Sequence, residues 1–332
     1  ILGDAVVIVK HTKGIDVDLN TLPLDDAKTF EMLSRGDTMG VFQLGGSGMT
    51  RYLKELKPSS IDDIMAMVAL FRPGPMESIP EYIRRKHNPK LVSYLDPRLK
   101  SILERTFGIL VYQDDVLYIA IEIAGYTWEE ADKLRKAMGK KIPKEMMAQR
   151  EKFLLGCVKK DMTRANAEAL WALIEPFAAY GFNKSHAASY GMVAYQTAYM
   201  KAHFPAEFVT AILSAETGDM DKIAEVIAGA KNSGITVLPP DVNESRTSFT
   251  YVDDQTIRFG LLAIKNLGSD VVEAVIAQRQ AAGEYCDLED FLRRVQHKNV
   301  NKKSLESLVK SGAMDRFGDR GLEELKLETP TF

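Results

Sequence analysis

The chain has 332 residues, of which 45% are hydrophobic and 27% charged, so it has a globular composition and room for two or three domains. Its formal net charge of −3 excludes a uniformly basic protein, and any nucleic-acid binding must depend on local clusters of lysine and arginine. Cys157 and Cys286 lie far apart and form no CxxC pair, which argues against a disulfide framework or a zinc site and favours a reducing, cytoplasmic compartment. Since no apolar run approaches the roughly 20 residues that span a bilayer, we expect no membrane contact.

The first 235 residues predict a mainly helical structure. The chain opens at Ile1 without a signal-peptide pattern, and we expect it to be a piece of a longer protein. Two helices with a turn at Lys13-Gly14 are predicted before residue 40. Ser60-x-x-Asp63 predicts a capping box that opens a helix ending before Arg72. Further helices are predicted to begin after Thr127, Thr163 and Ser185 and at Pro205, the first of them burying Trp128, Ala131, Leu134 and Met138 and ending at Gly139.

The pattern changes to mixed α and β structure after residue 235. Residues 235–238 predict a strand, and residues 248–252 and 256–259 predict a hairpin with its turn at 253–255. Helix pairs follow, and the residues after Phe317 are polar. The fold class predicted is mainly α, a large helical domain followed by a small α+β module. We place the region boundaries at 1–40, 41–235, 236–316 and 317–332.

The densest group of cations follows the predicted helix start at Thr127. Residues three or four apart share a helix face, and a lysine-rich face beside a forked arginine suits a triphosphate or a nucleic-acid backbone. A solvated cationic surface has the same pattern, and charge by itself does not separate the two. The cations are Lys133, Arg135, Lys136, Lys140 and Lys141.

A second candidate site is the string Tyr180-Gly181-Phe182-Asn183-Lys184-Ser185-His186. It combines a glycine turn, aromatic stacking surfaces and three polar donors just before a predicted helix start, which itself attracts anions. A capping role for His186 explains the same residue without any ligand.

Tyr112-Gln113-Asp114-Asp115 matches the YxDD signature of reverse transcriptases, in which paired aspartates on a β-hairpin bind catalytic magnesium. The flanking residues allow a strand–turn–strand, but Asp114 can equally begin a helix over residues 115–124. A two-metal polymerase also needs a further carboxylate on an adjacent strand, and the one other D-x-D, at Asp16, lies in a turn-like stretch. We therefore predict helix capping for Asp114 and Asp115 and keep the metal site as an alternative.

A third candidate is the segment 261–268, which continues into a predicted helix over 269–279. It approximates a helix-hairpin-helix motif, whose tight turn directs backbone amides at a DNA phosphate. Asn266 stands where the first glycine is usual, and asparagine tolerates the left-handed backbone conformation. Lys265, Gly268 and Ser269 complete the predicted contact, and a degenerate second copy is predicted over residues 301–312.

Seven strings together resemble the alpha subunit of bacterial DNA polymerase III, the C family of replicative polymerases, in order and over residues 5–316. They are Pro23-Leu24-Asp25-Asp26, Val41-Phe42-Gln43-Leu44, Ala69-Leu70-Phe71-Arg72-Pro73-Gly74-Pro75, Gly108-Ile109-Leu110-Val111-Tyr112-Gln113, Leu134-Arg135-Lys136-Ala137-Met138-Gly139-Lys140-Lys141, Gly181-Phe182-Asn183-Lys184-Ser185-His186 and Leu238-Pro239-Pro240-Asp241-Val242-Asn243.

The resemblance implies a palm-to-fingers connection over 1–40, a fingers domain over 41–235 and a helix-hairpin-helix module over 236–316. It implies that dNTP is bound by Arg135, Lys136, Lys140, Lys141, Asn183 and His186, and that Tyr180, Phe182 and Lys184 line the pocket of the template base pair. Lys265, Asn266, Gly268 and Ser269 are implied to bind duplex DNA. Lysine stands at position 136, where the family commonly has a second arginine.

The resemblance also implies that this chain itself has no catalytic or metal-binding residue. The family binds Mg²⁺ through palm aspartates upstream of Ile1, and its full protein binds template-primer DNA, the sliding clamp and other replisome subunits. We therefore expect a fragment that binds and does not polymerise. Two alternatives remain: a DNA-binding helix-hairpin-helix module without nucleotide specificity, and a reverse-transcriptase-like polymerase that uses Asp114 and Asp115.

Overall fold

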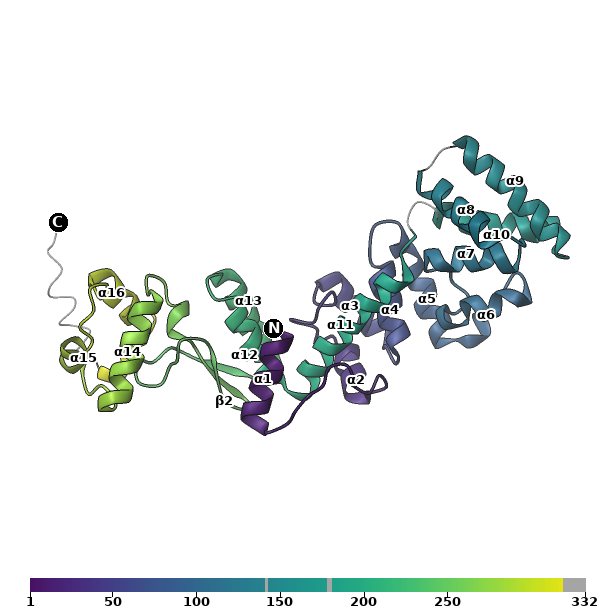
Figure 1. Ribbon diagram of the computed structural model, residues 1–332. Coiled ribbons are helices and arrows are strands. Elements are labelled where there is room, and N and C mark those ends of the chain that lie inside the picture. Colours follow the sequence, from purple (N-terminus) through teal and green to yellow (C-terminus); the bar gives the residue numbers. More distant parts are fainter. Residues whose placement is uncertain (141–142, 178–180, 319–332) are drawn as a thin grey trace. The chain divides into compact units, whose positions relative to one another are not determined.

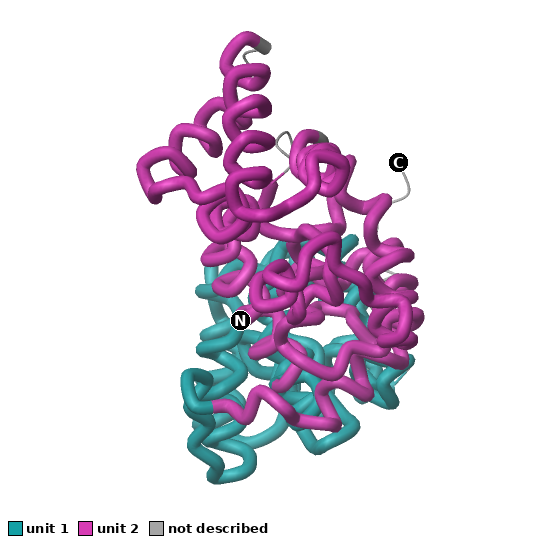
Figure 2. The backbone as a smooth tube through the Cα atoms, turned by 90° about the vertical axis from the view of Figure 1, so that its right-hand side faces the viewer, with its two compact units in different colours: residues 1–21, 200–332 teal, residues 22–199 magenta. Residues whose placement is uncertain are grey.

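The computed structural model describes residues 1–140, 143–177 and 181–318, which form sixteen α-helices, short 3-10 turns and one three-stranded sheet (Figure 1). The predicted mainly α fold with a small α+β module is confirmed. Two compact units are present, Leu22–Tyr199 and the combination of Ile1–Thr21 with Met200–Phe332 (Figure 2). The region boundaries at residues 40, 235 and 316 refer to roles in a polymerase and stay predictions. Within the described ranges no helix has the length and apolarity that crossing a membrane requires.

The first helices of the unit Leu22–Tyr199 begin where polar side chains cap them. Asp26 accepts a hydrogen bond from the Thr29 amide at 2.8 Å. The Ser60 hydroxyl accepts one from the Asp63 amide at 3.4 Å, as predicted, but the Asp63 carboxylate accepts from the Ser59 amide at 2.9 Å rather than from that of Ser60. The helix that Ser60 caps ends at Leu70, before Arg72, also as predicted. The helices are α2 (Ala27–Arg35), α3 (Ser47–Leu56), α4 (Ile61–Leu70), α5 (Ile79–His87) and α6 (Lys100–Leu103).

Four helices then pack around a core that includes Phe153 and Trp171 (Figure 1). They are α7 (Gln113–Glu122), α8 (Trp128–Lys140), α9 (Pro143–Lys159) and α10 (Arg164–Phe177). The capping box of α8 is confirmed, because the Thr127 amide donates to Glu130 at 3.0 Å and the Glu130 amide donates to Thr127 at 3.2 Å. Two expectations for α8 were wrong. Trp128 is 62% exposed rather than buried, and Gly139 lies inside the helix rather than at its end.

The long helix α11 (Lys184–His203) begins two residues earlier than predicted. Its cap is Asn183, whose Oδ1 accepts from the His186 amide at 2.9 Å, so the expected cap at Ser185 was wrong. Asn183 and Ser185 both offer a side-chain oxygen that can cap a helix, and the backbone conformation determines which of them does so. Helix α12 (Pro205–Ala215) starts at Pro205 as predicted.

The unit that contains the N-terminus joins distant parts of the sequence. Helix α1 (Leu2–Lys13), with Gly14 in the left-handed conformation at its end, packs on α12, and α13 (Met220–Asn232) follows. The sheet has the order β1-β3-β2, with β1 (Thr236–Leu238) parallel and β2 (Thr250–Asp253) antiparallel to β3 (Thr256–Arg258). Lys13 donates to the Tyr251 hydroxyl at 3.0 Å and pairs with Asp254, which fixes α1 to the hairpin.

The predicted helix-hairpin-helix region forms a separate core within the same unit. Its helices are α14 (Ser269–Ala282), α15 (Leu288–Arg294) and α16 (Lys302–Lys310). Val272, Val275 and Phe291 are fully buried among them. The segment before α14 buries Leu261, Ile264 and Leu267 in the same core and leaves Lys265, Asn266 and Gly268 exposed.

Candidate nucleotide and nucleic-acid interface

Three of the cations in the predicted cluster, Lys133, Arg135 and Lys136, lie exposed on α8 and are already paired within the helix. Arg135 donates to Asp132 at 2.7 Å and Lys136 pairs with the same carboxylate at 2.7 Å, while Lys133 pairs with Glu129 at 2.8 Å. Both cations lower the pKa of Asp132, Lys136 having the larger effect. The i,i+3 and i,i+4 spacing of these pairs was readable from the sequence.

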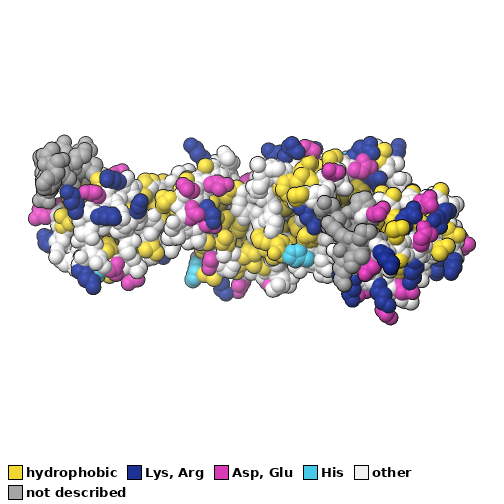
Figure 3. Space-filling view, turned by 90° about the horizontal axis from the view of Figure 1, so that it is seen from above, with side chains coloured by type: hydrophobic (Ala, Val, Ile, Leu, Met, Phe, Trp, Pro, Cys, Tyr) yellow, Lys and Arg dark blue, Asp and Glu magenta, His cyan; other side chains and the backbone are white. Residues whose placement is uncertain are grey.

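Two cations that share one carboxylate leave a local excess of positive charge. Exposed pairs of this kind contribute little, about 0–1 kcal/mol each, so a phosphate can displace Asp132 at small cost. The surface seen in Figure 3 shows cations and carboxylates interspersed, in agreement with the net charge of −3. The Lys140 side chain, Lys141 and Tyr180 lie outside the described residues.

The loop after Gly181 is held against the start of α7 by backbone bonds. The Gln113 amide donates to the Phe182 carbonyl at 2.9 Å, and Tyr112 and Phe182 form a short parallel bridge. The Lys184 amide donates to Asp114 Oδ2 at 2.8 Å, and the Lys184 ammonium lies over the Tyr112 ring at 5.4 Å from its centroid. The start of α7 and the loop at Phe182, about 70 residues apart in the sequence, are therefore bonded directly to each other.

The YxDD string is not a strand–turn–strand, because Asp114 and Asp115 lie in the first turn of α7. Asp115 is 2% exposed and accepts hydrogen bonds from the Tyr112 amide at 2.9 Å and the Val111 amide at 3.4 Å. These bonds, with the bond from Lys184 to Asp114, occupy the carboxylates in holding the backbone. Among the described residues no three side chains of His, Cys, Asp or Glu gather as a metal site would require. The pair does not fit the Mg²⁺ ligand set of a two-metal polymerase.

Burial raises the pKa of Asp115 to about 6, against the opposing effect of its backbone hydrogen bonds and of Lys184. The folded state therefore favours the protonated carboxyl, and this contribution to stability is complete below about pH 4 and lost as the pH rises through about 6. Between pH 4 and pH 7 we expect the free energy of unfolding of the wild type to fall by about 2–3 kcal/mol relative to that of Asp115→Asn. Urea titrations of both proteins at each pH measure this difference, and parallel curves would contradict the assignment.

A column of rings runs along one face of α11. Phe182 and His186 have their ring centroids 5.2 Å apart, His186 and Tyr190 are 4.0 Å apart, and Phe42 lies 5.3 Å from Tyr190. The Arg72 guanidinium lies over Phe182 at 4.7 Å from its centroid. Burial lowers the pKa of Arg72 below its usual range. Because His186 is exposed and Phe182 and Tyr190 are half-buried, the column offers ring faces and edges to a flat ligand.

Three members of this column were missed by the sequence analysis. His186 and Tyr190 lie four residues apart on one face of α11, a signal that would have found Tyr190, whereas Phe182 precedes the helix. Phe42 and Arg72 come from other segments, and no local pattern joins them to α11. The predicted pocket residues Phe182 and His186 are thus brought together, whereas Lys184 turns toward Tyr112 and Asn183 caps the helix.

The hairpin before α14 has the backbone conformation that the sequence predicted. Asn266 has a φ of 65°, in the left-handed region, and its side-chain amide donates to the Ser307 hydroxyl of α16 at 2.9 Å. Leu267 is buried, while Lys265, Gly268 and Ser269 are exposed. The element that precedes the hairpin is only a 3-10 turn, Leu261–Ala263, instead of a full helix.

In the first turn of α14 the Val271 amide donates to the Asp270 carboxylate at 2.9 Å and the Val272 amide donates to the Gly268 carbonyl at 3.1 Å, while the Ser269 amide precedes the intrahelical bonds. Helix α16 begins close by, since Asn299, just before it, donates its side-chain amide to Asp270 in the first turn of α14. Asn301 caps α16 by accepting from the Lys303 amide at 3.0 Å. Among the described residues Lys265, Lys302 and Lys303 form no ion pair. Two helix N-termini and mobile cations thus occur on one exposed surface, which suits phosphates.

The predicted residues therefore fall into separate groups. In the described part of the chain no hydrogen bond or ion pair joins Arg135 or Lys136 to the loop at Phe182, and both cations bond to Asp132. The loop and the ring column form one site at the start of α11. The hairpin at Asn266 belongs to the other compact unit.

Comparison with known proteins gives two family matches. Residues 1–161 match the finger domain of the bacterial DNA polymerase III alpha subunit, and residues 234–321 match a helix-hairpin-helix motif. These ranges contain the α8 cations and the Asn266 hairpin, respectively.

Curated relatives agree with these matches. DNA polymerase III subunit alpha of Thermus aquaticus is 51% identical over 324 residues, which are 96% of this chain and 26% of the relative. The Deinococcus radiodurans protein of the same name is 46% identical over 91% of this chain and 23% of its own length. The Mycobacterium tuberculosis protein is 44% identical over 96% of this chain and 27% of its own length. The chain spans about a quarter of the length of these relatives, and it belongs to the bacterial DNA polymerase III alpha subunit family, as the finger region followed by a helix-hairpin-helix segment.

Proposed function

We propose that this chain is the part of a DNA-directed DNA polymerase that holds the incoming dNTP and the template-primer DNA. The observation that carries the proposal is the column of Phe182, His186 and Tyr190, closed at one end by Arg72. Aromatic faces beside a cation stack on bases of any sequence, at about 1–3 kcal/mol per base. A replicative polymerase needs this tolerance, because it must accept each of the four base pairs.

The α8 cations supply the second part of the proposed site. Arg135 has a planar, forked set of donors that matches two phosphate oxygens, and Lys136 adds a mobile charge. Release of both from Asp132 onto a triphosphate replaces weak exposed pairs by charge-assisted hydrogen bonds. Lys140 and Lys141 follow on the sequence and extend the same proposal, as do the polar groups of Asn183 and Lys184.

In the reaction proposed for the whole protein, a primer 3′-hydroxyl attacks the α-phosphorus of the dNTP and pyrophosphate leaves. The share of this chain is to position the nucleotide and to neutralise charge on the leaving phosphates. We place the Mg²⁺ ligands in palm aspartates beyond this chain, since Asp114 and Asp115 are engaged in capping. The chain alone is expected to bind without polymerising, and contacts to the sliding clamp and other replisome subunits are assigned to the whole protein in the cytoplasm.

Arg135→Ala in an intact alpha subunit that contains this chain should raise KM for dNTP by about 10-fold or more. A lost charge-assisted hydrogen bond is worth about 1.5–3 kcal/mol, and each 1.4 kcal/mol is a factor of ten. Steady-state incorporation kinetics measure the effect. Arg164→Ala is the matched control, because Arg164 is 45% exposed and pairs with Glu168 on its own helix, as Arg135, 42% exposed, pairs with Asp132. Equal kinetics for the two variants would refute the assignment.

A DNA-binding module without nucleotide specificity is the second candidate, favoured by the exposed hairpin at Asn266. The two functions differ in their response to nucleotide. A dNTP bound by the folded chain raises its melting temperature, whereas a pure DNA binder shows no dNTP-dependent stabilisation. Thermal melts with and without dNTP separate them.

The hairpin itself should bind duplex DNA through phosphates. We expect Lys265→Ala to weaken binding and to reduce the slope of log K against log salt concentration by about 1. Lys310→Ala, at the other end of α16 and paired with Glu306, should change neither quantity. Fluorescence anisotropy at several salt concentrations measures both, and an unchanged slope for Lys265→Ala would remove the hairpin from the DNA contact.

A further inference from the structure

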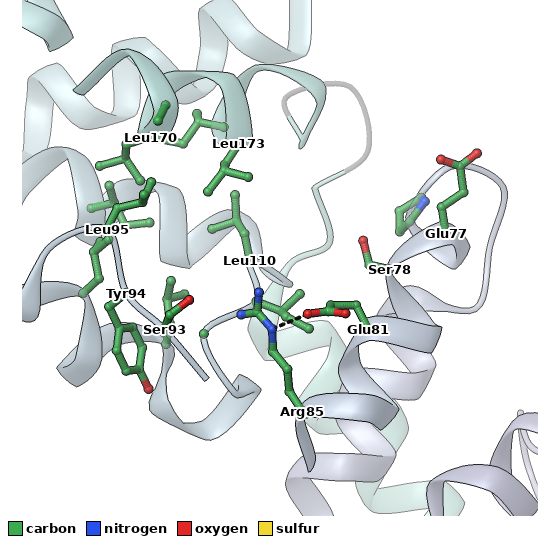
Figure 4. A pocket seen from close by; sticks show the side chains of 18 of the residues that line it. Glu77, Ser78, Glu81, Arg85, Ser93, Tyr94, Leu95, Leu110, Leu170 and Leu173 are labelled. Atoms are coloured by element: carbon green, nitrogen blue, oxygen red, sulfur yellow. Dashed lines mark hydrogen bonds and ion pairs between the residues drawn. The ribbon is translucent and has the colours of Figure 1, made fainter. Parts of the chain in front are cut away.

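A cavity of about 850 Å³ lies inside the unit Leu22–Tyr199, and its lining includes neither the α8 cations nor the ring column (Figure 4). Pockets for small molecules typically have about 300–1,000 Å³. Side chains of α5, of α10 and of the segment 93–110 form its walls. Most of the lining is aliphatic, and Leu95, Leu110, Leu170 and Leu173 face the space together (Figure 4). These walls suit an apolar body rather than a triphosphate.

One end of the cavity carries an arginine with donors to spare. Arg85 donates through Nε to Glu81 at 2.7 Å and through Nη1 to the Phe107 carbonyl at 3.1 Å. A guanidinium has five N–H donors, so these two bonds leave others for a ligand. The guanidinium points toward Leu110 and the cavity in Figure 4.

Glu81 also lines this end of the cavity, so the preference for an anion comes from the unused N–H donors of Arg85 and not from the net charge of the lining. Arg84 pairs with Glu81 at 2.7 Å, so two arginines share one carboxylate, and the pKa of Glu81 is lowered by both. Glu77 also lines the cavity, but it is exposed and lies at the opposite rim from Arg85 (Figure 4). A partly enclosed arginine binds a carboxylate or sulfonate with charge-assisted hydrogen bonds.

We propose that this cavity binds a small amphipathic anion, with its apolar body against the leucines and its single acidic group on Arg85. The site would be distinct from that for dNTP. Its wall includes Gly74 and Pro75, which follow Arg72, and Leu110, which precedes Tyr112. A ligand in the cavity would therefore contact the two segments that also contact Phe182. An effect on the nucleotide site rests on the proposed function, whereas binding of the anion does not.

The test uses a matched pair of fluorescent probes on the 332-residue chain, without nucleotide or DNA. The anion 8-anilinonaphthalene-1-sulfonate and the uncharged N-phenyl-1-naphthylamine share the same apolar body and differ in the sulfonate. We expect the anion to bind one site with a Kd about 10-fold or more lower than that of the neutral probe. Equal affinities would overturn the role of Arg85.

Two pairs of variants locate the site. Leu173→Trp puts a larger side chain at the wall of the cavity. It should weaken the binding of both probes by about 10-fold or more, because the probe then buries less apolar surface there. Leu155→Trp is the control, since Leu155 is 53% and Leu173 57% exposed and Leu155 does not line the cavity. Equal binding by these two variants would overturn the proposal.

Arg85→Gln should reduce the affinity for the anion to that for the neutral probe. Arg84→Gln, which removes the other partner of Glu81 outside the cavity, should leave both affinities unchanged. An equal loss in the two arginine variants would also overturn the proposal. If Arg85→Gln does not fold, the probe pair on the wild type and the leucine pair still decide the outcome.

Discussion

Asp63→Ala should lower the free energy of unfolding of the unit Leu22–Tyr199 by about 3–5 kcal/mol, because it leaves a buried charge without its partner. Asp63 is 2% exposed and pairs with Lys86. It also accepts hydrogen bonds from the Ser59 amide at 2.9 Å and the Tyr82 hydroxyl at 3.2 Å. Burial holds the pKa of Tyr82 far above its usual range, so this hydroxyl stays a donor. Without Asp63 the Lys86 ammonium keeps only its bonds to Lys57 and Ser59, at 3.0 Å each.

Tryptophan fluorescence in urea measures this loss, since both tryptophans, Trp128 and Trp171, lie in this unit. Asp62→Ala is the matched control, because the Asp62 side chain is 33% exposed and meets Arg105 only at 3.8 Å. We expect less than about 1 kcal/mol for this variant. The double variant Asp63→Ala with Lys86→Met should be more stable than Asp63→Ala alone. A loss of similar size at positions 62 and 63 would contradict the buried network.

Gly156→Ala should destabilise the helices α7 to α10 by about 1–3 kcal/mol, the cost of overpacking a well-packed core. A Cβ at this position in α9 would collide with the backbone carbonyl of Ala124, which follows α7. A backbone group cannot rotate away as the end of a side chain can. The chain must therefore shift one helix against the other, and the core around Trp171 loosens with it.

Gly139→Ala is the internal control for this prediction. Gly139 also lies inside a helix, α8, but a Cβ there meets nothing within 4 Å. Alanine at an unobstructed helical position should stabilise the protein by about 0.5–1 kcal/mol. The two substitutions therefore have opposite signs, and the fluorescence of Trp171 during urea unfolding reports on both. A gain in stability at position 156 would show that the approach of α9 to Ala124 is not close.

The two glycines bear on the proposed function because the helices they belong to carry the proposed phosphate contacts. Arg135 and Lys136 extend from α8, and the direction of that helix is set by the packing of its buried residues, Leu134 and Met138 among them. A shift of α9 would move α8 with it. Gly156→Ala should therefore weaken nucleotide binding together with stability, whereas Arg135→Ala should weaken binding with stability unchanged.

The sequence by itself determined the features that depend on neighbouring residues. Thr127 and Glu130 lie three residues apart, so their capping box follows from helix geometry. Asparagine tolerates a positive φ better than most residues other than glycine, and Asn266 has a φ of 65°. The family strings occur in order, and they identified the finger region without any tertiary contact.

Only the tertiary structure decided how distant segments combine. The sequence placed Phe182 and His186 in one site, but Arg72 and Phe42 join it through packing, and no spacing predicts that. The same is true of Asp114, which accepts a hydrogen bond from the Lys184 amide across 70 residues. Contacts within one helical turn are fixed by backbone geometry, whereas contacts across 70 or more residues depend on which apolar faces bury each other. The acidic pair that is most conspicuous in the sequence is therefore a capping element, and the rings on α11 are the better candidates for binding.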